Sequence, residues 1–312
     1  MRIILAAPRG FCAGVNMAIE CLRLAIEQYG APVYVYHEIV HNRWVVERFR
    51  QMGAVFVDEI EDVPKGAPLL YSAHGVSPGV RRAAAESGLK VIDATCPLVT
   101  KVHLEAVRYA REGFTVVLIG HAGHDEVIGT LGEAPESMVL VQTADDVDRL
   151  EVADPAKLAY LTQTTLSVDD AERIVGRLRA RFPAIIGPSR QDICYATQNR
   201  QAAVKQLAPA ADLVLVVGSR NSSNSQRLAE LGHSAGVATQ LVDGPDDIDL
   251  SRIRGDDTVL ITAGASAPED IVQDCVRLLV DRFRATVETA TICNEEVSFQ
   301  LPTDLRRHLH PR

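Results

Sequence analysis

Three cysteines of this chain recur in one local setting. Cys12, Cys96 and Cys194 stand in "RGFCAGV", "DATCPLV" and "DICYATQNR", and a stretch of helical period follows each of them. Pro97 is typical of a first helical turn, so Cys96 is expected at a helix N-terminus. Backbone N–H groups and the helix dipole favour the thiolate form there. Three such thiolates suit an iron–sulfur cluster or a zinc ion.

A set of three cysteines, rather than four, itself indicates a kind of chemistry. An electron-transfer ferredoxin normally uses four cysteines. Three would leave one iron of a four-iron cluster open to a substrate oxygen, which predicts catalysis. Cys21 and Cys275 lie in helical apolar patterns and are interpreted as small buried hydrophobes. Cys293 is interpreted as a non-ligand, because "NEEVSFQLP" after it favours a strand rather than a helix.

Polar residues follow the apolar strands at regular intervals from the three cysteines. His41, His124 and Asn224 come 29, 28 and 30 residues after Cys12, Cys96 and Cys194, and His74, Thr164 and Ser266 come 62, 68 and 72 residues after them. Apolar strands that alternate with helices predict parallel sheets, whose ligands bind beyond the carboxyl ends of the strands. The repeated spacing therefore indicates one supersecondary unit present three times.

The predicted fold class is α/β, with three similar parallel-sheet units in a pseudo-threefold arrangement around a central iron–sulfur site. We place the units at 13–96, 97–193 and 194–282, with 1–12 and 283–312 completing the third. Such an arrangement would turn the polar strand ends of all three units toward one centre.

The polar residues at these strand ends suit an anionic ligand. They are His41, His74, His124, Glu126, Thr164, Ser222, Ser223, Asn224 and Ser266. Hydroxyls, amides, imidazoles and helix N-termini bind a phosphate or diphosphate well. Ser222, taken alone, is more typical of an ordinary helix N-cap. Glu126, two residues after His124, is placed to supply a proton to a departing hydroxide.

Composition excludes several classes of protein. The 312 residues carry a net charge of −9, from 32 basic and 41 acidic side chains, which disfavours a nucleic-acid or anionic-membrane partner. No apolar run approaches the about 18 residues needed to span a bilayer. The first apolar stretch, residues 3–7, is too short for a signal peptide and favours a buried strand. We therefore expect a cytoplasmic protein.

Together these segments closely resemble the 4-hydroxy-3-methylbut-2-enyl diphosphate reductase family. The resemblance rests on "APRGFCAGV", "HEIVHN", "SAHGVSP", "DATCPLV", "GHAGHDEVIGT", "TQTTLS", "DICYATQNRQ", "GSRNSSNSQRL" and "TAGASAPE", and it runs from residue 1 to about residue 302. It implies an iron–sulfur oxidoreductase of the methylerythritol phosphate route to isoprenoids. The implied reaction removes the allylic hydroxyl of (E)-4-hydroxy-3-methylbut-2-enyl diphosphate and yields isopentenyl and dimethylallyl diphosphates.

The resemblance also implies a role for each matching residue. Cys12, Cys96 and Cys194 would bind a four-iron four-sulfur cluster with one open iron. The diphosphate substrate would contact His41, His74, His124, Ser222, Ser223, Asn224 and Ser266. Glu126, Thr164 and His124 would be catalytic, with Glu126 supplying protons and Thr164 binding the hydroxyl end.

The source of electrons and the identity of the metal leave alternatives. No GxGxxG follows a strand, so electrons are expected from a partner such as a ferredoxin or flavodoxin. One alternative is a zinc-dependent hydrolase or lyase that uses the same cysteines on a small phosphorylated substrate. A second is a non-catalytic iron–sulfur sensor that binds nucleic acid, which the negative net charge disfavours.

Overall fold

The structure is a computed structural model that describes residues 1–309, and it divides the chain into two compact units. Unit 1 comprises Met1–Val15, Val40–Arg48 and Tyr195–Ser298. Unit 2 comprises Asn16–Ile39, Phe49–Cys194 and the chain from Phe299 onward. Among the described residues unit 1 holds one sheet and unit 2 holds two, and every strand pairing is parallel.

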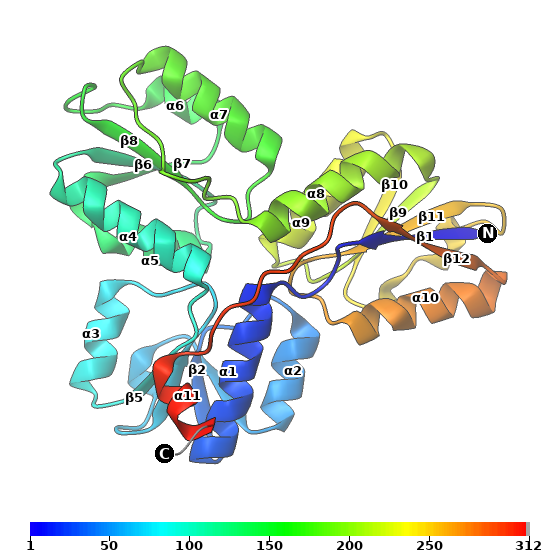
Figure 1. Cartoon of the computed structure of the whole chain (residues 1–312), viewed down its shortest axis with the longest axis horizontal. Coiled ribbons are helices and arrows are strands. Elements are labelled where there is room, and N and C mark those ends of the chain that lie inside the picture. The colour runs from blue at the N-terminus through cyan, green and yellow to red at the C-terminus, as the bar shows by residue number, and fades with distance from the viewer. Residues whose placement is uncertain (310–312) are drawn as a thin grey trace. The chain divides into compact units, whose positions relative to one another are not determined.

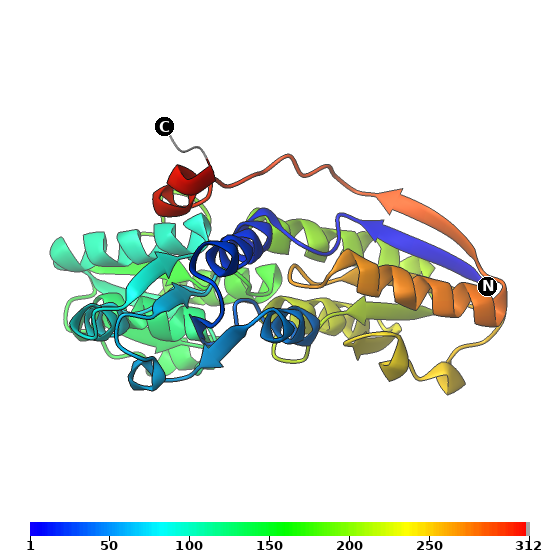
Figure 2. The same ribbon diagram turned by 90° about the horizontal axis from the view of Figure 1, so that it is seen from below.

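Unit 1 is built on a five-stranded sheet in the order β10-β9-β11-β1-β12. Its strands are β1 (Arg2–Ala7), β9 (Leu213–Val217), β10 (Ala238–Val242), β11 (Thr258–Ala263) and β12 (Thr286–Thr291). Its helices are α8 (Tyr195–Leu207), α9 (Ser223–Ser234) and α10 (Glu269–Phe283). Within this unit, β12 is the outermost strand beside β1 in Figure 2.

Alternating side chains of β9 are buried on both faces of this sheet. Leu213, Leu215 and Val217 join a core with Ile271 and other residues of α10. Val214 and Val216 join a second core with residues of α8 and α9. The continuous apolar run 213–217 is therefore what a central strand covered on both sides requires.

Unit 2 contains a four-stranded sheet in the order β3-β2-β4-β5 and a three-stranded sheet in the order β7-β6-β8. The first sheet consists of β2 (Val33–Tyr36), β3 (Ala54–Val57), β4 (Pro68–Tyr71) and β5 (Lys90–Asp93). The second consists of β6 (Thr115–Ile119), β7 (Met138–Val141) and β8 (Leu158–Thr162). The helices are α3 (Pro78–Glu86), α4 (Pro97–Arg111), α5 (Asp125–Glu133), α6 (Ala144–Arg149), α7 (Val168–Arg181) and α11 (Thr303–Leu309), and α1 (Ala13–Tyr29) and α2 (Arg43–Gln51) contribute residues to both units.

Helices cover both faces of the three-stranded sheet. Val117 and Ile119 pack with Ile174 and Leu178 of α7, while Leu118 packs against residues of α4 and α5 on the other face. Figure 1 shows α7 on one side of β6 and β8, and α4 and α5 on the other. This packing fixes α4 and α5, whose N-termini carry several of the predicted site residues.

The predicted class, an α/β fold with three parallel-sheet units, is confirmed. The unit boundaries at residues 96/97 and 193/194 and the pseudo-threefold arrangement stay predictions. One predicted element is wrong. The segment 294–302 forms no strand, and the last strand is β12, six residues of which five are exposed. Glu295, in this segment, accepts hydrogen bonds from Asn199 and Arg200.

Two cysteines are buried as predicted. Cys21 and Cys275 are fully inaccessible to solvent, and burial raises the pKa of each thiol to about 12. Both therefore remain neutral thiols in the core. Among the described residues, no helix is both long enough and apolar enough to cross a bilayer.

Candidate functional site

The three cysteines that the sequence singles out stand directly before helices. Cys12 precedes α1, Cys96 is the N-cap of α4 with Pro97 as the first helical residue, and Cys194 precedes α8. This placement confirms the expected helix N-termini. The cause is local, because a helix-forming stretch follows each cysteine directly.

The backbone of each cysteine is held in the same way. The N–H of Cys12 donates to the carbonyl of Ala265 at 3.2 Å, that of Cys96 to Ala73 at 3.0 Å, and that of Cys194 to Thr164 at 3.0 Å. Each acceptor is either a predicted strand-end residue (Thr164) or the residue directly before one (Ser266 and His74). The sequence spacing predicted that these positions are equivalent. The same kind of backbone hydrogen bond occurs at all three cysteines.

This donor set fits an iron–sulfur cluster. All six cysteines lie in the described part of the chain and none of them forms a disulfide. Cys12, Cys96 and Cys194 are partly exposed, whereas Cys21 and Cys275 are buried. Partly exposed sulfur atoms are accessible to a metal, and cysteine sulfurs are the ligands that iron–sulfur clusters take.

In unit 1, two predicted anion ligands are brought together at the end of β11. The Ser266 hydroxyl donates to the carbonyl of His41 at 2.9 Å. Asn42, the next residue, is buried and its Oδ1 accepts from the N–H groups of Trp44 and Val45, so it caps α2. The cap and the serine together fix the backbone that carries the His41 imidazole.

The N-terminus of α9, also in unit 1, carries the other three predicted anion-binding residues of this unit, Ser222, Ser223 and Asn224. Ser222 is the N-cap, and its Oγ accepts from the Ser225 N–H at 3.3 Å, so the capping interpretation is confirmed. Asn224 is 3% exposed, and neither its Oδ1 nor its Nδ2 has a hydrogen-bond partner among the described residues. A buried unsatisfied amide costs about 1–3 kcal/mol. The Asn224 amide therefore has the capacity to bind a ligand.

Glycine makes room for this helix start. A Cβ at Gly218 or Gly264 would collide with the side chain of Ser225, and one at Gly264 would also lie 3.5 Å from Nδ2 of Asn224. Gly264 N–H donates to the carbonyl of Val217 at 2.9 Å, which joins the ends of neighbouring strands β9 and β11. Ser223 lies in the same turn of α9.

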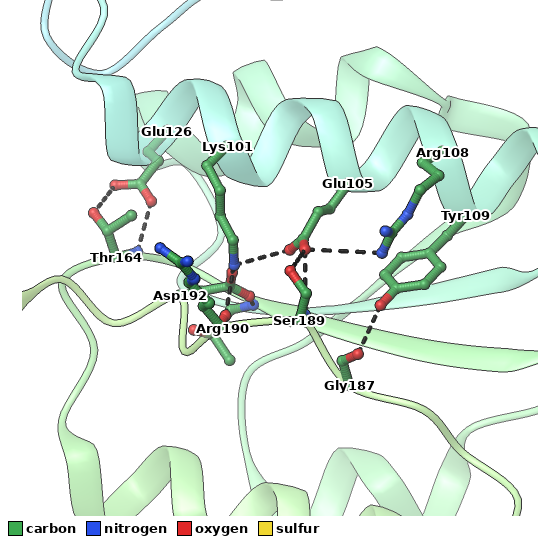
Figure 3. Close-up of polar contacts among 11 residues, drawn as sticks. Lys101, Glu105, Arg108, Tyr109, Glu126, Thr164, Gly187, Ser189, Arg190 and Asp192 are labelled. Carbon is green, nitrogen blue, oxygen red and sulfur yellow. Dashed lines mark hydrogen bonds and ion pairs between the residues drawn. The ribbon is translucent and has the colours of Figure 1, made fainter.

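In unit 2, Glu126 and Thr164 form a buried pair. The Glu126 carboxylate accepts from the Thr164 N–H at 2.6 Å and from its hydroxyl at 2.9 Å (Figure 3). The two residues are 3% and 5% exposed. Glu126 lies in the first turn of α5, where the helix dipole stabilises a carboxylate. The contact brings together the residue that is expected to supply protons, Glu126, and the residue that is expected to bind the hydroxyl end of the substrate, Thr164.

The other two predicted residues of unit 2, His74 and His124, lie side by side. Their rings meet edge to face with centroids 5.9 Å apart. His124 is the N-cap of α5, and its Nδ1 accepts from the Glu126 N–H at 3.2 Å. With Nδ1 as an acceptor of a backbone N–H, a neutral His124 carries its ring proton on Nε2.

Two residues that the sequence interpretation missed join this group. Asp125 contacts Nδ1 of His37 at 2.7 Å through Oδ1, and Nδ1 of His74 at 3.9 Å through Oδ2. The hydrogen bond that His37 donates to Asp125 outweighs burial and raises the pKa of His37. His37 has a left-handed backbone, with φ of 57°, a conformation rare outside glycine and asparagine. The criterion that selected His74, a polar residue soon after an apolar strand, also fits His37.

These features define a class of protein: a parallel α/β protein with a partly exposed cysteine at three helix N-termini, a buried carboxylate–hydroxyl pair and an unsatisfied amide. The chain belongs to the LytB protein family, whose model matches residues 3–280.

Individual relatives are similar over nearly the full length. A 4-hydroxy-3-methylbut-2-enyl diphosphate reductase of Rhodopirellula baltica is 61% identical over 306 residues, which cover 98% of this chain and 96% of the relative. The protein of the same name from Streptomyces avermitilis is 54% identical over 309 residues, covering 99% and 91%. The structure of the E-1-hydroxy-2-methyl-but-2-enyl-4-diphosphate reductase from Plasmodium falciparum is similar with a TM-score of 0.95 and 40% identity, covering 99% of this chain and 98% of that one.

Proposed function

We propose that the protein is an oxidoreductase that converts (E)-4-hydroxy-3-methylbut-2-enyl diphosphate into isopentenyl and dimethylallyl diphosphates. The observation that carries the proposal is the recurrence of one cysteine anchor in three sheets, in a chain 61% identical to a relative with that reductase name. The reaction consumes two electrons and two protons. The allylic C–O bond breaks, the oxygen leaves as water, and carbon gains one hydrogen.

The diphosphate would bind to polar groups rather than to basic side chains. In unit 1 the candidates are His41, Ser222, Ser223, Asn224 and Ser266, and in unit 2 they are His74 and His124. The unsatisfied amide of Asn224 supports this assignment, since its Nδ2 can donate to a phosphate oxygen. The N-terminus of α9 adds backbone N–H groups that favour an anion.

Cys12, Cys96 and Cys194 would hold the iron–sulfur cluster. When bound as a four-iron four-sulfur cluster with three cysteine ligands, it supplies the electrons and one Lewis-acidic iron. Electrons would reach it from a separate carrier such as a ferredoxin or flavodoxin.

Glu126 and Thr164 would handle the proton. The Thr164 hydroxyl now donates to Glu126. The Thr164 hydroxyl can instead accept a hydrogen bond from the substrate hydroxyl. It can also pass a proton from the Glu126 carboxyl group toward the substrate hydroxyl. A carboxyl group and a hydroxyl within hydrogen-bond distance form a short path for the proton that converts hydroxide into water. Exclusion of solvent from both residues limits competing proton exchange with water.

Asp125 would orient His37 through a hydrogen bond to Nδ1, and its charge lies 3.9 Å from Nδ1 of His74. A carboxylate beside Nδ1 of an imidazole favours the proton at that nitrogen and stabilises the cationic ring. A cationic His74 would bind a diphosphate more strongly than a neutral one.

The proposal is tested by anaerobic turnover. Protein purified without oxygen is analysed for iron, acid-labile sulfide and zinc, and then incubated with the allylic diphosphate and a chemical electron donor. We expect iron with sulfide, and both five-carbon diphosphates as products by mass spectrometry. Active protein with stoichiometric zinc and no sulfide would contradict the proposal.

A further inference from the structure

One face of α4 is joined along three successive turns to the segment 187–192. Lys101, Glu105 and Tyr109 follow one another at intervals of four residues, so their side chains lie on the same face of the helix. The tyrosine hydroxyl donates to the carbonyl of Gly187 at 2.6 Å, and Glu105 Oε1 accepts from the Ser189 hydroxyl at 2.6 Å. Figure 3 shows these contacts in a row beneath the helix.

The end of this row that is nearest to the N-terminus of α4 is an ion pair. Lys101 Nζ donates to the carbonyl of Arg190 at 2.6 Å and to Oδ1 of Asp192 at 2.5 Å, and it lies 2.9 Å from Oε2 of Glu105. Burial lowers the pKa of Lys101, but its hydrogen bonds to the two carboxylates outweigh burial and raise it. Lys101 is therefore cationic at neutral pH.

Asp192 connects three parts of unit 2. Its side chain has no exposed surface. Oδ2 accepts from the N–H of Thr162, the last residue of β8, at 2.8 Å, while Oδ1 contacts the lysine of α4. Two residues beyond Asp192, the N–H of Cys194 donates to the carbonyl of Thr164. One carboxylate thus ties together α4, the end of β8 and the segment that leads to Cys194.

The ends of this row are chemically significant. The helix α4 begins directly after Cys96, and the segment 187–192 that it holds ends two residues before Cys194. An ion pair with one buried partner, such as Lys101 and Asp192, is a weak source of stability, because desolvation of the charges offsets their attraction. Its advantage over an apolar contact is direction, since charge-assisted hydrogen bonds fix the geometry of both partners.

We propose that Lys101 and Asp192 are a positioning pair that sets the backbone of Cys194 relative to Cys96, so that both sulfurs can bind one cluster. This inference rests on the proposed function, because it assumes that these two cysteines are cluster ligands. Neither Lys101 nor Asp192 is assigned a contact with substrate. Partners that orient ligands typically change metal affinity by about 10- to 100-fold when they are altered.

The test compares matched variants of the full chain. Lys101→Met and Asp192→Asn break the pair, whereas Arg177→Met and Asp148→Asn break an exposed ion pair of the same unit, 2.7 Å long. Each protein is reconstituted anaerobically with iron and sulfide. The readouts are iron and sulfide per chain, the electron paramagnetic resonance spectrum of the reduced cluster, and the rate at which an iron chelator removes the cluster.

We expect both variants of the pair to lose the cluster about 10- to 100-fold faster than the wild type, with an altered spectrum. The two controls should match the wild type. Lys101→Arg should restore most of the retention, because a guanidinium donates to both carboxylates. Wild-type rates and spectra in Lys101→Met and Asp192→Asn would overturn the positioning role. A wild-type chain that binds no cluster would instead overturn the proposed function on which it rests.

Single hydrogen-bond deletions keep the test decisive if the charge variants fail to fold. Ser189→Ala and Tyr109→Phe each remove one contact of the same row. Cluster loss should be accelerated by both changes, more by Ser189→Ala, which is nearer to Cys194 in the chain. Unchanged rates in both folded variants would overturn the proposal.

Discussion

Replacement of Glu126 by glutamine separates proton transfer from stability. The side chain keeps its shape and one of its two oxygens. The carbonyl oxygen of glutamine can still accept from the Thr164 N–H, while its NH₂ group faces the Thr164 hydroxyl, which then accepts instead of donating. Both contacts survive, but they change from charge-assisted to neutral.

The magnitudes follow from this exchange. A hydrogen bond to a charged group contributes about 1.5–3 kcal/mol and a neutral one about 0.5–1.5 kcal/mol, so each of the two contacts loses about 1–1.5 kcal/mol. Glu126→Gln should therefore lower the free energy of unfolding by about 2–3 kcal/mol. Loss of a positioned general acid costs about 10²- to 10⁴-fold in rate. That range corresponds to about 3–5 kcal/mol of activation free energy. The effect on turnover should therefore exceed the effect on stability.

The assay is single-turnover reduction under anaerobic conditions, with substrate binding measured separately by calorimetry on the oxidised protein. Substrate affinity should stay near the wild-type value, since Glu126 is assigned no contact with the diphosphate. Glu136→Gln, which alters an exposed glutamate of the same unit, serves as the control. Near-normal turnover in Glu126→Gln would refute the proton-transfer role. A loss of activity in proportion to the loss of folded protein would show that Glu126 has only a structural role.

Three further predictions concern other parts of the molecule. Asn224→Leu removes two unsatisfied buried atoms, so the ligand-free chain should gain up to about 1–3 kcal/mol of stability. The variant should also lose the rise in Tm that added pyrophosphate causes. A less stable variant whose Tm still rises with pyrophosphate would contradict the anion site. The raised pKa of His37 means that its bond to Asp125 stabilises the fold fully below about pH 6.5 and is lost as pH rises through the folded pKa. Asp125→Asn should thus cost about 1 kcal/mol in thermal melts at acidic pH and little at alkaline pH, and an equal cost at both would exclude this origin. Arg200 is fully buried and hydrogen-bonded to Glu295 and to the backbone. Arg200→Met should lower the free energy of unfolding by about 3–5 kcal/mol, as measured by urea unfolding. A decrease below about 1 kcal/mol would show that the pair with Glu295 is dispensable.

Local sequence rules account for the framework. The six polar residues expected after apolar strands, His41, His74, His124, Thr164, Asn224 and Ser266, follow β2, β4, β6, β8, β9 and β11. A helix follows each of Cys12, Cys96 and Cys194. These features depend on neighbours within a few residues: an apolar run, a proline at the first helical position, a serine cap. The one misplaced strand is also instructive. β12 is an exposed edge strand without a strong apolar pattern, and its partner β1 lies at the opposite end of the sequence.

The polar contacts needed tertiary structure. Asp125 and His37 are 88 residues apart, and Lys101 and Asp192 are 91 apart. No periodicity links such positions, because their contact depends on how helices pack on a sheet rather than on spacing along the chain. Sequence alone therefore determined which residues have chemistry and on which strand ends and helix starts they stand. Only the folded chain decided which of them are hydrogen-bonded, which are buried, and which amide is left for a ligand.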